Sequence, residues 1–151
     1  MSHLKKGDAA PHFTANNQKG EEVSLGDYQE KKLVLYFYPK DDTPGCTKEA
    51  CNLRDNYARF QAQGYEVLGV STDDENAHIK FIEKYELPFD LLVDADHKIA
   101  ESYDVWGEKN MFGKKFMGIF RTTFVIDGEG NLEEVIEKVK TEEHSEQILK
   151  P

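Results

Sequence analysis

The stretch LVLYFYPKDDTPGCTKEAC, residues 33–51, runs from an apolar strand pattern through a turn into a helix pattern. It also contains both cysteines of the 151-residue chain, Cys46 and Cys51. The run KLVLYFY (32–38) is continuously apolar and aromatic, which is typical of a central strand that is buried on both faces. This strand therefore ends a few residues before a helix that carries every thiol of the protein.

Two further runs, YEVLGVST (65–72) and FDLLVD (89–94), have the same character and predict two more buried strands. Between them, DENAHIKFIEKYEL (74–87) has helical spacing, and Pro88 stops it. The residues that predict its buried face are Ile79, Phe81, Ile82 and Tyr85. Strands that alternate with helices predict βαβ units around a parallel sheet.

The two ends of the chain have a different pattern. Residues 11–25 alternate weakly and indicate a small hairpin or an irregular lead-in, whereas TTFVIDGEGNLEEVIEKV (122–139) predicts two strands around a DGEGN turn. TEEHSEQILK (141–150) predicts a short closing helix with a capping box at Thr141. We therefore predict one α/β domain over residues 1–151, with a thioredoxin-like fold, a central mixed β-sheet flanked by helices, and an N-terminal hairpin extension.

Composition limits the partners. The formal net charge of −10 argues against nucleic acid or an anionic membrane as the main partner. No apolar run approaches the ~20 residues of a membrane span, and the N-terminus MSHLKKGDAAPHF predicts no secretory signal. Two cysteines in a domain of this size fit a reducing compartment, so we expect a cytoplasmic protein.

Local signals position Cys46 at the start of a helix. Thr43 is a good N-cap residue, Pro44 suits the first helical position, and Gly64 suits a C-terminal stop. Cys46 is then the third helical residue, where free N–H groups and the helix dipole favour a thiolate over a thiol. The apolar stripe that points this face toward the sheet comprises Ala50, Leu53, Tyr57 and Phe60.

Cys51 lies on another face of the same helix. Five residues give a Cα separation of about 8.6 Å, beyond the ~7 Å that a disulfide tolerates. If the two sulfurs join, the first turns must unwind. The plain alternative is that both cysteines are buried and structural. A zinc site is poorly supported, because no further ligands occur at the usual spacing. A disulfide exchanger would need a Cys-x-x-Cys motif, which is absent.

The segment PKDDTPGCTKEAC (39–51) closely resembles the peroxiredoxins, whose active-site pattern is Pro-x-x-x-Thr/Ser-x-x-Cys. Pro39, Thr43 and Cys46 match it position for position. The second cysteine resembles the bacterioferritin comigratory protein, or Q-type, branch. GIFRTTFVID (118–127) is similar to the segment that supplies the active-site arginine of the family, here Arg121.

The resemblance implies a thioredoxin-dependent thiol peroxidase that reduces hydrogen peroxide and alkyl hydroperoxides in antioxidant defence and cell redox homeostasis. Cys46 would be the peroxidatic nucleophile, which becomes a sulfenic acid, and Cys51 the resolving cysteine of an intramolecular disulfide. Thioredoxin or a similar dithiol protein would be the electron donor, and no metal or organic cofactor is implied. Since the resolving cysteine is on the same chain, a monomer suffices.

The residue chemistry agrees with these roles. Arg121 offers fixed donors and a permanent charge to the leaving oxygen, and the Thr43 hydroxyl can hold the sulfur and the peroxide. Pro39 can shield the thiolate from water. Each of these residues also has a plain structural alternative. Thr43 could be only an N-cap, Arg121 could be a solvated charge at a strand edge, and Pro39 could simply end a strand. Trp106 is either a lid over the pocket or an ordinary anchor.

Other functions stay open on the residues alone. A disulfide oxidoreductase or redox sensor would use the same cysteines, and a binding module would keep them inert. The five histidines are scattered, and none has a partner at metal-ligand spacing in the sequence.

Overall fold

The computed structural model describes residues 2–149, and its central strand is the predicted apolar run, β3 (Lys32–Phe37). β3 lies between the parallel strand β4 (Tyr65–Ser71) and the antiparallel strand β8 (Thr122–Ile126). β5 (Asp90–Val93) continues the parallel core on the far side of β4. The βαβ reading of the sequence is thereby confirmed.

Antiparallel pairs complete the sheet at both edges. β9 (Leu132–Ile136) pairs with β8 at one edge, as the predicted hairpin requires. At the other edge, β1 (Thr14–Asn17) pairs with β5, and β2 (Glu22–Ser24) pairs with β1. The seven strands run in the order β2-β1-β5-β4-β3-β8-β9, which confirms both the mixed sheet and the N-terminal hairpin.

The central strand separates two hydrophobic cores, because successive side chains of a strand point to opposite faces. Leu33, Leu35 and Phe37 belong to a core that α4 (Lys98–Ser102) covers. The alternate residues of the strand belong to a second core on the other face. Complete burial of one such Leu or Phe stabilises the fold by about 1.5–3 kcal/mol.

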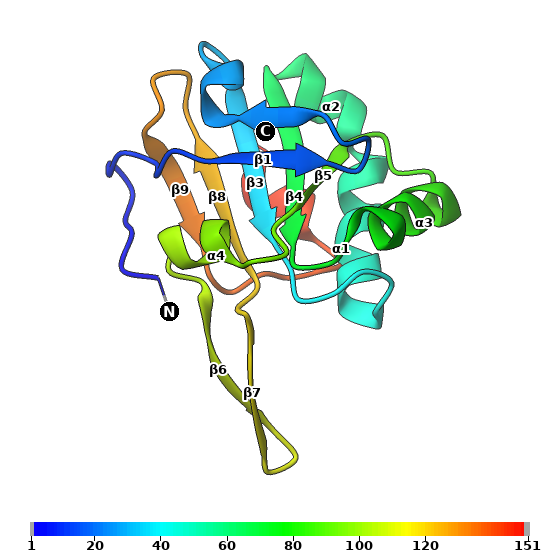
Figure 1. Cartoon of the computed structure of the whole chain (residues 1–151). Helices are drawn as coiled ribbons and strands as arrows, with labels where there is room; N and C mark the ends of the chain where they lie inside the picture. Colours follow the sequence, from blue (N-terminus) through cyan, green and yellow to red (C-terminus); the bar gives the residue numbers. More distant parts are fainter. Residues whose placement is uncertain (1, 150–151) are drawn as a thin grey trace.

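Four helices cover the second face (Figure 1). They are α1 (Pro44–Asp55), α2 (Tyr57–Ala62), α3 (Glu75–Tyr85) and α5 (His144–Ile148). Each contributes apolar side chains to this core, and α1 contributes Cys46 along with Ala50 and Leu53. The expected stripe that directs Cys46 toward the body of the protein is therefore confirmed.

The cysteine-bearing helix is shorter than the sequence predicts. The chain was expected to stay helical as far as Gly64, but it breaks at Asn56, which separates α1 from α2. The side-chain Nδ2 of Asn56 donates to the carbonyl of Asn52 at 2.9 Å, a local bond that competes with the helical ladder. Gly64, with a φ of +85°, follows the end of α2 instead.

Two other helix predictions need correction. In α3 the buried residues are His78 and Phe81, whereas Ile79 is 37% exposed. α5 begins at His144 behind Glu143, with no side-chain capping bond, so the predicted capping box at Thr141 is wrong. Lys150, at the end of that predicted helix, lies outside the described residues.

A second, two-stranded sheet was not predicted. β6 (Trp106–Met111) and β7 (Lys114–Ile119) form an antiparallel hairpin that projects from the body of the protein (Figure 1). Its turn consists of Phe112 and Gly113, whose φ values of +54° and +78° are both left-handed. Within residues 2–149 no helix has the length and apolarity that crossing a membrane would require.

Candidate active site

Cys46 lies in the first turn of α1, as predicted, and its side chain is only 1% exposed. Pro44 occupies the first helical position, and its missing N–H costs nothing there. The N–H groups of such a first turn have no partner within the helix, so they are available to a sulfur or to an anion beside it. The helix start thus presents the thiol to a polar environment at the edge of an apolar core.

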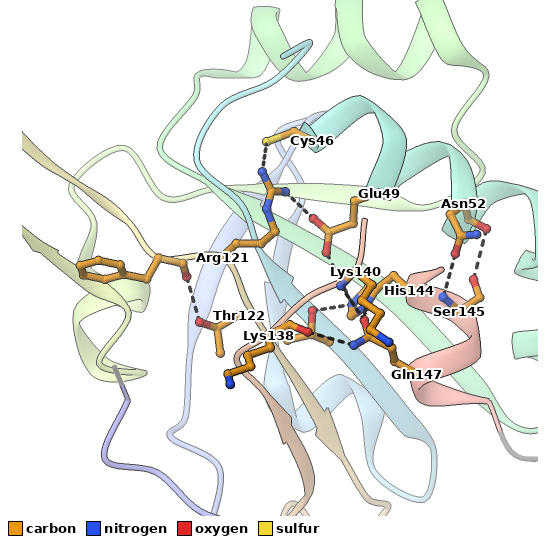
Figure 2. A network of polar contacts seen from close by, with 12 residues as sticks. Cys46, Glu49, Asn52, Arg121, Thr122, Lys138, Lys140, His144, Ser145 and Gln147 are labelled. Carbon is orange, nitrogen blue, oxygen red and sulfur yellow. Dashed lines mark hydrogen bonds and ion pairs between the residues drawn. The ribbon is translucent and has the colours of Figure 1, made fainter. Parts of the chain in front are cut away.

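Arg121 contacts the sulfur directly. It precedes β8, which pairs antiparallel to β3, so the start of β8 lies beside the end of β3. Its Nη2 lies 3.4 Å from Cys46 Sγ (Figure 2). Gly45 makes room for this approach, because a Cβ there would stand 3.0 Å from the same Nη2. The structure therefore confirms that Arg121 lies beside Cys46.

Glu49 anchors the other side of the guanidinium. Arg121 Nη1 donates to Glu49 Oε1 at 2.7 Å, and the carboxylate is completely buried. Burial raises the pKa of Glu49 to about 7, although the charge and hydrogen bond of Arg121 oppose the rise. Burial tends to lower the pKa of Arg121, but Glu49 and Cys46 outweigh it and raise that pKa. The guanidinium is thereby held in place as a permanent charge beside the sulfur.

The network continues from Glu49 into α5 (Figure 2). Glu49 Oε2 lies 3.5 Å from Nε2 of the buried His144 and makes no hydrogen bond. His144 Nδ1 faces Gln147 Oε1 at 2.8 Å, and Nε2 faces the hydroxyl of Thr123 at 2.8 Å. Burial lowers the pKa of His144 to about 4. The neutral ring therefore donates through Nδ1 to Gln147, and its Nε2 accepts from Thr123.

A second set of contacts ties α5 to α1 immediately after Cys51. Asn52 Nδ2 donates to the Glu142 carbonyl at 2.9 Å, and Asn52 Oδ1 accepts from the Ser145 N–H at 2.7 Å (Figure 2). The hydroxyl of Ser145 also donates to the Asn52 carbonyl at 3.2 Å. The C-terminal half of α1 is therefore anchored by α5.

Cys51 is half-buried and, like Cys46, is a free thiol. Both cysteines lie within the unbroken helix α1. An intact helix keeps their Cα atoms about 8.6 Å apart, so α1 in this conformation holds the two thiols apart.

Thr43 and Pro39 lie on the loop between β3 and α1. Thr43 has the extended backbone of an N-cap residue, but its hydroxyl donates to the carbonyl of Lys40 at 2.9 Å and caps nothing. Thr43 is thus the N-cap residue of α1, as predicted, although its side chain makes no capping hydrogen bond. Its oxygen keeps lone pairs that can accept a hydrogen bond. Pro39 is half-buried at the end of the central strand.

The same loop is fixed by a buried histidine. His78 Nδ1 lies 2.7 Å from Asp41 Oδ2, and Nε2 lies 2.8 Å from the carbonyl of Leu92. Asp41 also accepts from the Tyr38 hydroxyl, and its N–H donates to Asp73 at 2.8 Å. Sequence spacing gave no histidine a ligand partner, but the fold brings His78, Asp41 and Asp73 within 4.8 Å of one another.

This cluster is already filled by its own hydrogen bonds. Both neighbours of His78 are acceptors, so both ring nitrogens carry protons and neither has a lone pair for a metal. Burial opposes this charge, but Asp41 outweighs it and raises the pKa of His78. The imidazolium and Asp41 together hold the loop that leads to Thr43.

Lys109, in the middle of β6, adds a second cation near the site. Its Nζ lies 5.6 Å from the centre of the Phe120 ring, next to Arg121. Burial and the charge of Arg121 lower the pKa of Lys109, while Cys46 opposes the fall. Beside it, Phe120, Arg121, Thr122 and Glu137 line an open hollow of about 400 Å³.

The remaining site predictions have mixed outcomes. Trp106 stacks on His97, with ring centres 4.2 Å apart, so it serves as an anchor at the base of β6.

The sequence interpretation missed Glu49, Lys109 and His144. A signal existed for Glu49, because an acidic residue three positions after Cys46 falls on the buried stripe of the helix.

Comparison with known proteins gives consistent matches. Residues 6–135 match the AhpC/TSA family. The chain is 50% identical over 146 residues to peroxiredoxin Bcp of Bacillus subtilis, covering 97% of this chain and 93% of that protein. A cysteine-to-serine variant of Xylella fastidiosa PrxQ superposes with a TM-score of 0.91 at 34% identity, covering 98% and 94% of the two chains.

A third match is the Xanthomonas campestris bacterioferritin comigratory protein, whose structures address its alkyl peroxide reduction activity. It has a TM-score of 0.84 and 35% identity, covering 90% of this chain and 87% of that one.

Proposed function

We propose, from the premise that this chain belongs to the AhpC/TSA family and is a peroxiredoxin of the Bcp type, that Cys46 is its peroxidatic nucleophile. The protein is a thiol peroxidase that reduces peroxides, with a thioredoxin-like fold, so an inert binding module is excluded. The contact that supports the assignment is the approach of Arg121 Nη2 to Cys46 Sγ at 3.4 Å.

In the first step the Cys46 thiolate attacks one peroxide oxygen in line with the O–O bond. The S–O bond forms, the O–O bond breaks, and the sulfur is oxidised by two electrons to a sulfenic acid. The leaving oxygen takes a proton and departs as water or an alcohol. A guanidinium beside the sulfur stabilises first the thiolate and then the charge that develops on the leaving oxygen.

Thr43 and Pro39 complete the proposed site. The proton of the Thr43 hydroxyl is engaged by Lys40, so its oxygen can accept the O–H of a bound hydroperoxide. Pro39 shields the thiolate from water at the strand end. Glu49 acts through Arg121, because it fixes the position of the guanidinium.

In the second step Cys51 attacks the sulfenic acid, releases water and forms an intramolecular disulfide with Cys46. The helical separation requires the first turns of α1 to unwind before this attack. Anchoring of Asn52 by α5 would confine the unwinding to residues 44–51.

A dithiol protein of the thioredoxin type would then reduce the disulfide through a mixed disulfide. Sulfur atoms donate and accept the electrons in each step of the proposed cycle, so the reaction needs no metal or organic cofactor. The chain would work as a monomeric single domain over residues 1–151, because both cysteines are its own. Free thiols of this kind fit the reducing conditions of the cytoplasm.

The decisive experiment is one equivalent of hydrogen peroxide followed by thiol counting and mass measurement. We expect the loss of both thiols and of two hydrogens, without overoxidation. Cys51→Ser should still become sulfenylated rapidly at Cys46. Full peroxidase activity in Cys46→Ser would show that the nucleophile is wrongly assigned.

A thioredoxin-coupled assay over several peroxides then tests the donor and the substrate range. Fast turnover with thioredoxin and peroxide alone supports the peroxidase cycle. A redox sensor with the same cysteines would turn over little until a separate target protein was added.

A further inference from the structure

The β6–β7 hairpin displays apolar side chains where a soluble protein has no folding reason to place them. Phe112 at its turn is 97% exposed. Met111, Phe116 and Met117 keep between 43% and 56% of their surface exposed. Except for Ile79, these are all of the large exposed hydrophobic residues among residues 2–149, so the apolar surface is concentrated on one element.

The turn itself is not optimised for folding. Two-residue hairpin turns with positive φ at both positions favour Asn-Gly, because Asn tolerates the left-handed region. Here the first position holds Phe112, a bulky residue that rarely adopts a positive φ. The register Met111↔Lys114 fixes this turn at the tip. The sequence thus keeps an exposed aromatic ring at a position where a polar residue would fold better.

The hairpin also has a charge opposite to that of the body. Between Trp106 and Ile119 it carries Lys109, Lys114 and Lys115 against one acid, Glu108, in a chain whose net charge is −10. Lys109 turns back to Phe120, and Glu108 pairs with the exposed Lys115 at 3.8 Å, so Lys114 and Lys115 are the lysines nearest the tip. Strands of six residues, rising about 3.3 Å each, make the hairpin about 20 Å long. That exceeds twice the Debye length of about 8 Å at physiological salt. The acidic body therefore does not cancel the attraction of the tip to an anion.

The apolar groups surround the tip instead of forming one flat face. The pairing places Met111 and Phe116 on one side of the hairpin and Met117 on the other, with Phe112 at the end. Lysines accompany them on both sides. A protein partner would cover one side, whereas a lipid interface can receive apolar groups all around while its headgroups bind the ammonium ions.

We propose that the β6–β7 hairpin docks the protein reversibly on an anionic lipid surface, with Phe112 and the methionines in the interface and Lys114 and Lys115 at the headgroups. The net charge of the whole chain predicted no such partner, but the distribution of charge argues for one through this hairpin. Arg121 follows β7 by two residues, so docking would hold the Cys46 site close to the lipid surface.

The test is co-sedimentation of the full chain with vesicles of equal parts phosphatidylglycerol and phosphatidylcholine, and with vesicles of phosphatidylcholine alone. We expect binding to the anionic vesicles only, weakened by added salt. Phe112→Asn should reduce the partition coefficient about tenfold or more, because it removes the aromatic ring. Because Asn suits the turn, it should not unfold the hairpin. Lys114→Gln and Lys115→Gln should each reduce the coefficient about fivefold.

The matched controls are Ile79→Asn and Lys80→Gln on α3, which make similar changes away from the hairpin and should leave binding unchanged. Equal partition of the native chain and Phe112→Asn would overturn the proposal, as would binding that ignores lipid charge. A dimer that Phe112→Asn converts to a monomer would overturn it in favour of a second copy of the chain. The measurement needs no peroxide, so its outcome is independent of the proposed thiol chemistry.

Discussion

Glu49 and His144 face each other between α1 and α5, with Glu49 Oε2 3.5 Å from His144 Nε2 and both side chains completely buried. Because this nitrogen accepts from Thr123, a carboxylate opposite it finds no donor. A neutral carboxyl avoids leaving a negative charge without a donor at this buried oxygen, which makes no hydrogen bond. This agrees with the pKa of Glu49, which burial raises to about 7, and with the pKa of His144, which burial lowers to about 4.

Glu49→Gln should therefore change how stability depends on pH. The pKa of Glu49 is raised on folding from 4.5 to about 7, so its contribution is fully present below about pH 4.5 and is lost as the pH rises through 7. The loss should be about 3 kcal/mol of unfolding free energy. Denaturant unfolding at several pH values should show the variant without this loss, whereas the exposed control Glu83→Gln keeps it. Equal pH slopes in the native chain and Glu49→Gln would contradict the assignment.

Gly45→Ala should lower peroxidase activity without unfolding the protein. The new Cβ would meet Arg121 Nη2 at 3.0 Å, so the guanidinium must shift by a few tenths of an ångström from the sulfur. We expect kcat/KM to fall about tenfold, less than the 100-fold or more expected of Arg121→Gln. Gly26→Ala is the control, because a Cβ there meets nothing within 4 Å. Unchanged kinetics in Gly45→Ala would show that the contact has no catalytic weight.

Oxidation should unwind only part of α1. After one equivalent of peroxide, backbone N–H groups of residues 47–55 should lose protection from hydrogen exchange, because their helical acceptors are the carbonyls of residues 43–51, which the disulfide takes out of the helix. The N–H of Ser145, which donates to Asn52 Oδ1 at 2.7 Å beyond the unwound segment, should stay protected. Cys51→Ser provides the control and should keep the whole helix protected. Loss of protection at Ser145 as well would disprove the anchoring.

His78→Gln should destabilise the loop before the active site. Removing a buried cation leaves Asp41 uncompensated and should cost about 3 kcal/mol near pH 6. The pKa of His78 is raised on folding, so its stabilisation is fully present below about pH 6.5 and is lost as the pH rises through the folded-state value. The cost of the substitution, measured by denaturant unfolding, should shrink accordingly at high pH. The exposed His12→Gln should behave like the native chain, and a cost that is constant with pH would refute the charged state.

The sequence was most informative where one physical signal dominated. The continuous apolar run at 32–38 could only be buried on both faces, and Pro44 and the stripe through Ala50 and Leu53 oriented the helix. Those two elements already determine where Cys46 lies. Arg121 came from the resemblance of GIFRTTFVID to the arginine segment of the family, and the antiparallel pairing of β8 with β3 brings it beside Cys46.

Prediction failed where tertiary contacts outweighed local pattern. The β6–β7 hairpin has exposed Met and Phe side chains on both faces, so it lacks the alternation that marks a half-buried strand. The break at Asn56 depends on a side-chain bond to Asn52 that composition does not reveal. His78 and Asp41 are 37 residues apart, and only the fold brings them together.

The anchored end of α1 has a consequence for recovery after each turnover. Starting a helix from nothing is slow, because the first turn fixes several residues for a single hydrogen bond. Residues from Asn52 onward stay anchored to the α5 segment in the proposed cycle, so they template the return of residues 44–51 by elongation. Helix elongation takes nanoseconds per residue, so the return of α1 to its reduced conformation would not limit the turnover rate.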